Sequence, residues 1–321
     1  MTFPSPIRPG DIVLSRGTGW ISRAICLLDD SPVSHALLAH RHGRLAETVG
    51  QGLQTVTFDE AREGHDLILA RTLATPADPE PVLAVADVHL ERGARYAHQQ
   101  IVLLAVLCLT RRAALGPGAH GMIRSVLDQA AAALNSMAER GQHPMICSEF
   151  VYRCYHEARP EAPYVLKIGT DDAHDGAPTL LQWAGTQPNL DAVAAPARLV
   201  GFDPAKAETA LSPLIAAFSA AAGRPGLASA VVPPDTDTDG GLLASIGAFG
   251  AALHRTRTPR QEQDATRPPT VQQAVEAIRT THAAPDFVTP GDLARTTSLT
   301  EIHRNEDTAP AIKTATQLLR R

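Results

Sequence analysis

The sequence has few aromatic residues and lacks a long apolar run. Aromatic residues make up 4% of its 321 residues. The longest apolar run, residues 101–109, is about half of the ~20 residues that a membrane-spanning helix needs. The segment up to Pro9 also lacks the charged and then apolar pattern of a secretory signal. We therefore expect a cytoplasmic protein with no transmembrane segment, while signal-independent export would leave no trace in the sequence.

The sequence also lacks an excess of basic residues. Lys and Arg number 29 against 34 Asp and Glu, which gives a formal net charge of -5. Since no global positive field exists to hold a polyanion, we do not expect nucleic acid as a partner. Local Arg clusters, such as Arg111 with Arg112, leave peripheral contact with an anionic membrane open, although such runs are usually just solvated.

Cysteine is scarce and scattered. The four cysteines, Cys26, Cys108, Cys147 and Cys154, form no CxxC pair and no spacing with histidine that is typical of a zinc site. We therefore expect neither a metal nor a cofactor. Cys147 and Cys154 lie seven apart on an expected helix, which separates their Cα atoms by ~10 Å, beyond disulfide reach. Free thiols are the expectation.

What the sequence does have is enough apolar residues for a core, 44% of the chain, arranged in two successive patterns. Short β-rich runs bounded by glycines fill the first 75 residues and predict an antiparallel meander; they lie at 11–14, 34–40, 45–49, 53–58 and 66–71. Helical patterns follow at 82–92, 97–110, 121–140 and 146–158.

Cys147 begins the most informative of these helices. Pro144 limits extension of the helix backwards, and Glu149 in the first turn suits the helix dipole. The positive end of a helix stabilises a thiolate, so Cys147 is placed to become a nucleophile. A small cysteine on an inward face is more often a buried hydrophobe, and a catalytic role therefore requires a base nearby.

His35 lies in an apolar expected strand, where a histidine needs a polar partner. If the turn after this strand is the three-residue loop 41–43, Leu37 faces Glu47, and His35 and Glu47 are diagonal neighbours on one face. A two-residue loop would put them on opposite faces. The carboxylate could then orient the imidazole of a catalytic base, the alternative being a satisfied core histidine.

In this order, these residues resemble a known family, the circularly permuted papain-like cysteine hydrolases. The YiiX/YebB branch of the NlpC-type superfamily is nearest in motif style, and relatives of lecithin retinol acyltransferase share the order of histidine before cysteine. The resemblance is carried by Pro9-Gly-Asp-Ile-Val-Leu14, Ser34-His35, Glu47, Gly93 with Tyr96, and Cys147-Ser-Glu-Phe-Val151. The sequence departs from the family in the long helical region 98–143 between histidine and cysteine.

The resemblance implies an α+β fold of the permuted papain-like type. Its antiparallel sheet would pack on the helix that carries Cys147, with added Ala-rich helices. It also implies acyl transfer, with Cys147 as nucleophile, His35 as base and Glu47 as the residue that orients His35. The substrate would be an amide or isopeptide bond of a peptide. A lipid acyltransferase or thioesterase acting on an acyl-lipid, or a catalytically inactive binding module, are the alternatives, and the oligomeric state stays open.

Four further residues are candidates for binding substrate. Ser34 precedes the histidine, Ser148 follows the cysteine, and Gly17 could approach substrate with bare backbone. Tyr96 belongs to the family resemblance. An ordinary turn at Gly17 and packing of Tyr96 against the catalytic helix are the alternatives.

The composition shifts near residue 205, where small-residue helices and polar stretches begin. The segment Thr289-Pro-Gly-Asp-Leu293 resembles the proline-containing stretch that closes domains of this family. We therefore expect a catalytic core at 1–205, an Ala-rich helical insertion with flexible linkers at 206–285, and a C-terminal segment at 286–321 that returns to the core.

Overall fold

The computed structural model divides into two compact units. The first comprises residues 1–97, 145–170 and 285–321, and the second comprises 98–144 and 171–284. The boundaries that we expect from the sequence, at 205 and 285, stay a prediction. The structure describes residues 3–19, 22, 25, 26, 29, 31–49, 52–92, 120–139, 145–168, 180–187, 239–257, 270–282 and 288–306.

The first unit is built on a six-stranded sheet with the strand order β4-β3-β2-β1-β5-β6, in which all neighbours are antiparallel. The strands are β1 (Ile12–Gly17), β2 (His35–Ala39), β3 (Arg44–Val49), β4 (Gly52–Thr57), β5 (His65–Leu73) and β6 (Leu299–Glu306). The expected α+β class with an antiparallel sheet is confirmed, while the permuted papain-like topology stays a prediction. Strand β6 comes from the C-terminal stretch of the chain and was not predicted from the sequence.

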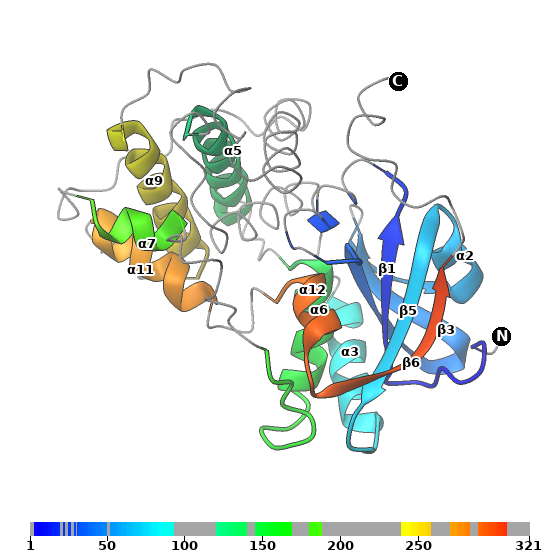
Figure 1. Ribbon diagram of the computed structural model, residues 1–321. Helices are drawn as coiled ribbons and strands as arrows, with labels where there is room; N and C mark the ends of the chain where they lie inside the picture. The colour runs from blue at the N-terminus through cyan, green and yellow to red at the C-terminus, as the bar shows by residue number, and fades with distance from the viewer. Residues whose placement is uncertain are drawn as a thin grey trace, which may run out of the picture. The chain divides into compact units, whose positions relative to one another are not determined.

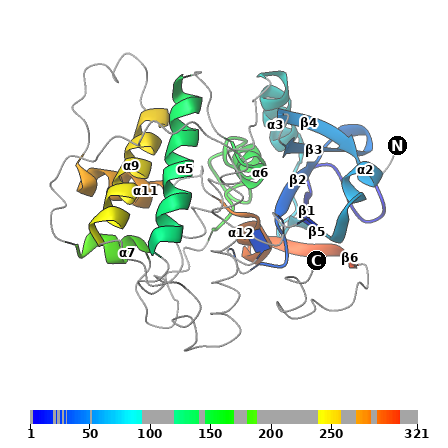
Figure 2. The same ribbon diagram turned by 90° about the horizontal axis from the view of Figure 1, so that it is seen from above.

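Four α-helices and a 3-10 turn are described in this unit. They are η1 (Arg41–Gly43), α2 (Phe58–Arg62), α3 (Glu80–Arg92), α6 (Cys147–His156) and α12 (Pro290–Arg295). Helices α3, α6 and α12 lie along one side of the sheet and α2 lies on the other, as Figure 1 and Figure 2 show.

An apolar cluster lies on each face of the sheet because successive strand residues point to opposite faces. The larger cluster joins the sheet to α6 and α12, and its buried members include Ile12, Leu14, Leu38, Phe150, Val151 and Leu293. The smaller cluster lies under α2 and includes Ile7, Val13, Leu37, Leu45, Ala61 and Ile68. Helix α6 is therefore packed against the strands by its Phe150 and Val151 face, as its sequence pattern predicts.

The turn before β1 explains the Pro9-Gly-Asp motif. The carboxylate of Asp11 accepts a hydrogen bond of 2.7 Å from the backbone N–H of Arg8. Gly10 has φ +92°, and a Cβ atom there would lie 2.6 Å from the Cβ of Pro79. The hydroxyl of Tyr155, which is 1% exposed on α6, donates to the carbonyl of Gly10. The motif thus ties the start of the sheet to the helix that begins with Cys147.

The second unit is helical where it is described. Its helices are α5 (His120–Glu139), α7 (Leu180–Gly185), α9 (Asp239–Arg257) and α11 (Val271–His282). Helix α9 packs against both α5 and α11. Gly250 permits the close approach to α11, since a Cβ atom there would overlap the carbonyl of Ala274. The hydroxyl of Ser245 on α9 donates to the carboxylate of Asp128 on α5 at 2.7 Å.

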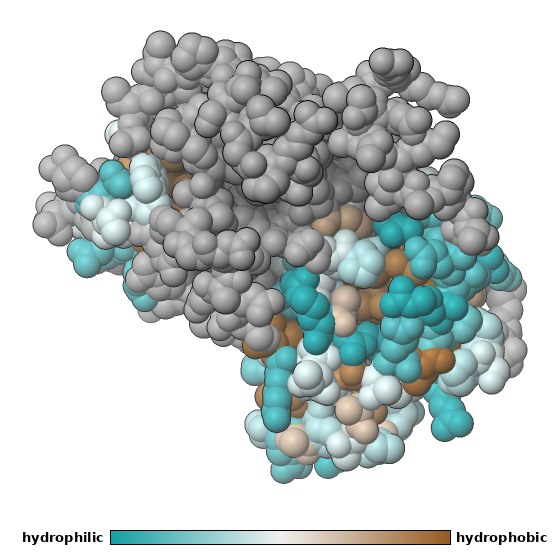
Figure 3. Space-filling view, in the orientation of Figure 1, coloured by the Kyte–Doolittle hydropathy of each residue, from teal (hydrophilic) through white to brown (hydrophobic). Residues whose placement is uncertain are grey.

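The surface of the first unit is largely polar on the side drawn in Figure 3. Hydrophilic residues cover most of its described part there, with apolar residues scattered among them. Among the described residues, the large apolar side chains that are exposed are Val88 and Val165. None of the helices in the described ranges has the length and apolar character needed to cross a membrane.

We expect Tyr155→Phe to lower the free energy of unfolding by about 1–2 kcal/mol, because the buried carbonyl of Gly10 then loses its hydroxyl donor. Urea denaturation at neutral pH measures the change. Tyr152→Phe is the matched control, because Tyr152 lies half-buried on the same helix and Phe preserves its stacking on His156. Tyr152→Phe should lower the free energy of unfolding by no more than about 0.5 kcal/mol. Equal losses in the two variants would refute a specific role of the Tyr155 hydroxyl.

Candidate active site

The hairpin β2–β3 sets which face His35 and Glu47 occupy. Its strands are joined through η1, where His42 (φ 59°) and Gly43 (φ 69°) both take the left-handed conformation. Leu37 lies opposite Glu47 in the strand pairing, so the register expected from a three-residue loop is confirmed. Because Leu37 and His35 point to the same face, His35 and Glu47 become diagonal neighbours there.

The imidazole of His35 is held by a short polar chain. Its Nε2 lies 2.9 Å from Oε2 of Glu47, and the amide of Gln54 on β4 donates to Oε1 of Glu47 at 2.9 Å. The His35 side chain is 19% exposed and that of Glu47 is 11% exposed. Gln54 was not expected from the sequence. Its position opposite Glu47 on the next strand would have been found by extending the register across β3 and β4.

Cys147 is the first residue of α6. The preceding residue, Ile146, has extended backbone (φ -81°, ψ 161°), and its N–H donates to the carboxylate of Glu149 at 3.3 Å. Cys147 is 4% exposed. Its sulfur accepts hydrogen bonds from the backbone N–H groups of Ala36 on β2 and of Ser148. The nucleophile candidate thus meets the strand of His35 at the positive end of its own helix.

Cys147 and His35 interact through charge and hydrogen bonding. Burial disfavours the thiolate of Cys147, yet the charge and hydrogen bond of His35 outweigh this effect and lower the pKa of the thiol. Burial likewise disfavours the imidazolium of His35, but the interactions with Cys147 and then Glu47 raise the pKa of His35 to about 10. Since Nε2 binds Glu47, the other ring nitrogen, Nδ1, is left for the sulfur. Each group thus favours the charged form of the other, so the two groups titrate together.

Glu47 supplies the opposite charge for the imidazolium. Burial opposes its ionisation, but its hydrogen bonds and charge interaction with His35, together with the hydrogen bond from Gln54, lower the pKa of the carboxyl below its ordinary value. His65, at the start of β5, is electrostatically coupled to both His35 and Glu47. Burial and the positive charge of His35 lower the pKa of His65, so it faces the pair as a neutral imidazole.

The other described cysteines lie in environments that favour the protonated thiol. Burial raises the pKa of Cys26 to about 11, despite the nearby charge of Arg16. Burial also raises the pKa of Cys154 well above its ordinary value. Both are free thiols, as is Cys147. Cys108 lies outside the described residues.

Three of the four residues expected to bind substrate lie in the described part of the chain. The hydroxyl of Ser34 bonds to that of Ser22, and Gly17 donates its N–H to the Ser22 hydroxyl at 2.8 Å. The hydroxyl of Ser148 is fully buried and has no hydrogen-bond partner among the described residues. Tyr96 lies outside the described residues. Ser34 and Ser148 thus adjoin His35 and Cys147 in the chain with buried hydroxyls, while Gly17 binds Ser22 through its backbone. Contact of these three residues with substrate stays a prediction.

In the part of the chain that the structure describes, no group of three or more His, Cys, Asp or Glu side chains could hold a metal ion. A thiolate next to an imidazolium that is held by a carboxylate can attack a carbonyl and return a proton to the leaving group.

Comparison with known proteins finds similarity to a protein named as a probable peptidase. The chain is 28% identical over 156 residues to "Probable lipoprotein peptidase YaeF" of Escherichia coli (strain K12). The match covers 47% of this chain and 56% of that protein, so the chain spans about half the length of a curated relative that it matches. No protein-family model matches the chain, and no solved structure matches it.

We expect iodoacetamide to modify Cys147 much faster than Cys26 or Cys154 near neutral pH, because Cys147 alone among them has a lowered pKa. Peptide mass spectrometry across a pH series measures the rate at each cysteine. In His35→Asn the apparent pKa of Cys147 should rise to or above the ~8.5 of a free thiol. Uniform modification in the folded wild-type protein would contradict an activated thiol.

The Glu47–His35 pair should stabilise the fold within a defined pH window. The folded pKa of Glu47 is lowered, so its contribution is present above the ordinary carboxyl value of ~4.3 and is lost as pH falls. The folded pKa of His35 is raised to about 10, so its contribution is complete below the ordinary ~6.5 and is lost as pH rises through about 10.

Glu47→Gln should therefore lower the free energy of unfolding most between about pH 5 and 6.5, by on the order of 2 kcal/mol. The loss should become progressively smaller toward pH 10. Urea denaturation across this range measures the difference from wild type. The control is Glu60→Gln, because Glu60 caps α2 at Thr57 and has no histidine partner among its contacts. A cost for Glu47→Gln that does not change between pH 6 and pH 10 would show that the pair is not ionised.

Proposed function

We propose that the protein is a peptidase-type cysteine hydrolase that acts by acyl transfer. Cys147 is the nucleophile, His35 the acid–base catalyst and Glu47 the residue that orients His35, with Gln54 fixing Glu47. The observation that carries the proposal is the pairing of a helix-start thiol with a histidine that is itself held at 2.9 Å by a buried carboxylate. The similarity to a protein named as a peptidase supports the same reaction class.

The proposed reaction has two halves. The Cys147 thiolate attacks the carbonyl carbon, and the backbone N–H groups at the start of α6 stabilise the tetrahedral oxyanion. The His35 imidazolium then donates its proton to the leaving nitrogen, the C–N bond breaks, and a thioester to Cys147 remains. Water attacks this thioester while His35 accepts its proton, which releases the carboxylic acid and restores the thiolate–imidazolium pair.

The proposed substrate is an amide or isopeptide bond of a peptide. The name of the relative refers to lipoproteins, so lipid-modified peptides are the first substrates to test. Cys147 and His35 specify the type of reaction, but they do not specify which acyl group is transferred. A thioester intermediate forms equally from an ester, and the substrate series must therefore include acyl esters with the same acyl chain.

We expect peptide amides or N-acylated peptides to be cleaved by the wild-type protein and to remain intact with Cys147→Ala. Mass spectrometry of products and of the intact protein detects both turnover and the acyl group on Cys147. Glu47→Gln should lower kcat by roughly 10- to 100-fold, because the base loses its orienting partner. Cys26→Ala is the matched control and should leave kcat unchanged. Equal turnover with Cys147→Ala would exclude the mechanism, and cleavage of esters alone would move the assignment to a thioesterase.

A further inference from the structure

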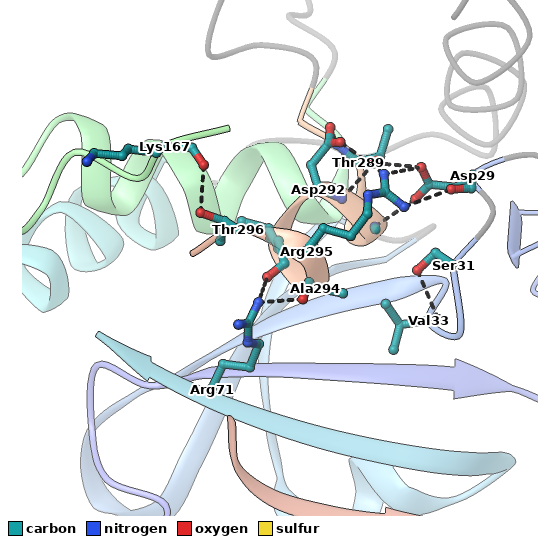
Figure 4. Close-up of polar contacts among 12 residues, drawn as sticks. Asp29, Ser31, Val33, Arg71, Lys167, Thr289, Asp292, Ala294, Arg295 and Thr296 are labelled. Carbon is teal, nitrogen blue, oxygen red and sulfur yellow. Dashed lines mark hydrogen bonds and ion pairs between the residues drawn. The ribbon is translucent and has the colours of Figure 1, made fainter. Parts of the chain in front are cut away.

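Helix α12 contacts the helix that begins with Cys147 and also contacts Asp29, six residues before His35. It begins at Pro290, more than 250 residues after β2 in the chain, and packs against α6. Leu293 of α12 and the preceding Val288 are buried in the same apolar cluster as Phe150 and Val151 of α6. On another side, α12 meets Asp29, which precedes His35 by six residues. Figure 4 shows the polar contacts around this helix.

Asp29 is held by several groups at once. Its carboxylate is 5% exposed and accepts hydrogen bonds from the Thr289 hydroxyl at 2.8 Å and from the Gly291 N–H at 2.7 Å. Arg295 donates to the backbone carbonyl of Asp29 at 3.0 Å and to its carboxylate at 3.3 Å. Asp29 is thereby fixed through both its side chain and its main chain.

The sequence of α12 is specific for this contact. A Cβ atom on Gly291 would lie 2.5 Å from Oδ2 of Asp29, so a side chain at this position would displace the carboxylate. The first turn is closed by Thr289 and Asp292, whose side chains each accept the backbone N–H of the other. At the other end of the helix, Arg71 on β5 donates to the carbonyls of Leu293 and Ala294.

The chain between Asp29 and His35 is also constrained. The N–H of Ser31 bonds to the carbonyl of Cys26 at 3.0 Å, and the Ser31 hydroxyl accepts the N–H of Val33 at 3.2 Å. Ser34 then joins β1 through its N–H, which donates to the carbonyl of Ser15 at 2.9 Å. A displacement of Asp29 would therefore reach the start of β2 through a short segment in which Ser31, Val33 and Ser34 are held by hydrogen bonds.

We propose that Asp29 and α12 form a latch whose role is to position His35 against Cys147, which makes Asp29 a positioning residue of the active site. The inference rests on the proposed function, because it concerns the same thiol and imidazole. Residues 289–295 would then help to set the reactivity of Cys147 in addition to packing against the core.

The test compares the reactivity of Cys147 with stability in latch variants. Gly291→Ala, Asp29→Asn and Arg295→Gln each remove or displace contacts of Asp29. The matched control is Thr57→Ala, which removes the equivalent side-chain cap from the short helix α2 on the other face of the sheet. Unfolding by urea and the iodoacetamide rate at Cys147 are measured for each variant from pH 5 to pH 9, with rates corrected for the unfolded fraction.

We expect the latch variants to react at Cys147 at least about fivefold more slowly than wild type near pH 6.5, with the pH midpoint shifted upward, and Thr57→Ala to stay within about twofold. Arg295→Lys, which keeps the charge, should recover part of the rate that Arg295→Gln loses. If Asp29→Asn does not fold, Arg295→Gln carries the test, since the Arg295 side chain is 41% exposed and its loss is milder.

Latch variants that lose stability but keep the wild-type rate and pH midpoint would overturn the latch and leave the proposed function standing. A wild-type Cys147 with the reactivity of an ordinary thiol would overturn both. The two failures are distinguished by the wild-type titration, which is measured first.

Discussion

The contact between Cys147 on α6 and His35 on β2 is the interaction around which the other candidate site residues of the first unit are arranged. Separating two opposite charges from water is costly unless each has further partners. Here the sulfur of Cys147 faces two backbone N–H groups, and the imidazole of His35 binds a carboxylate that is in turn held by Gln54. Each of these partners comes from a different element, so the sheet register and the start of α6 must both be correct for the pair to exist.

Two contacts hold α6 in the position that brings Cys147 to His35. From the N-terminal side, the hydroxyl of Tyr155 binds the turn at Gly10, which Pro79 packs against. From the C-terminal side, Leu293 packs in the core that Phe150 and Val151 complete. The sequence thus contains two similar motifs, Pro9-Gly-Asp and Pro290-Gly-Asp. In each of them the glycine allows a close contact between distant parts of the chain.

Local sequence patterns were sufficient to predict much of the first unit. Short β-rich runs bounded by glycines indicated β1 to β5. Of the two loop lengths considered, the three-residue loop places Glu47 opposite Leu37 and beside His35, as the structure has them. Helical spacing predicted the inward face of α6 with Phe150 and Tyr155 buried. These features depend on periodicity and turn geometry, which a short stretch of sequence contains.

The features that sequence analysis missed depend on contacts across long separations. Strand β6 is mostly polar and lies at the edge of the sheet, so its sequence lacks the apolar alternation that identifies a strand. Gln54 is recognisable only after the β3–β4 register is known. The binding of Asp29 by Thr289 joins residues 260 apart, and nothing local to either residue signals the other.

The most direct test of the central claim is the protonation state of His35, measured by NMR of its labelled imidazole nitrogens across pH in the wild-type protein and in Cys147→Ser. The account predicts that His35 titrates far above the ~6.5 of an ordinary histidine in the wild-type protein and that the midpoint falls when the thiolate is removed. A His35 that is neutral at pH 7 in both proteins would contradict the thiolate–imidazolium pair and the catalytic role built on it.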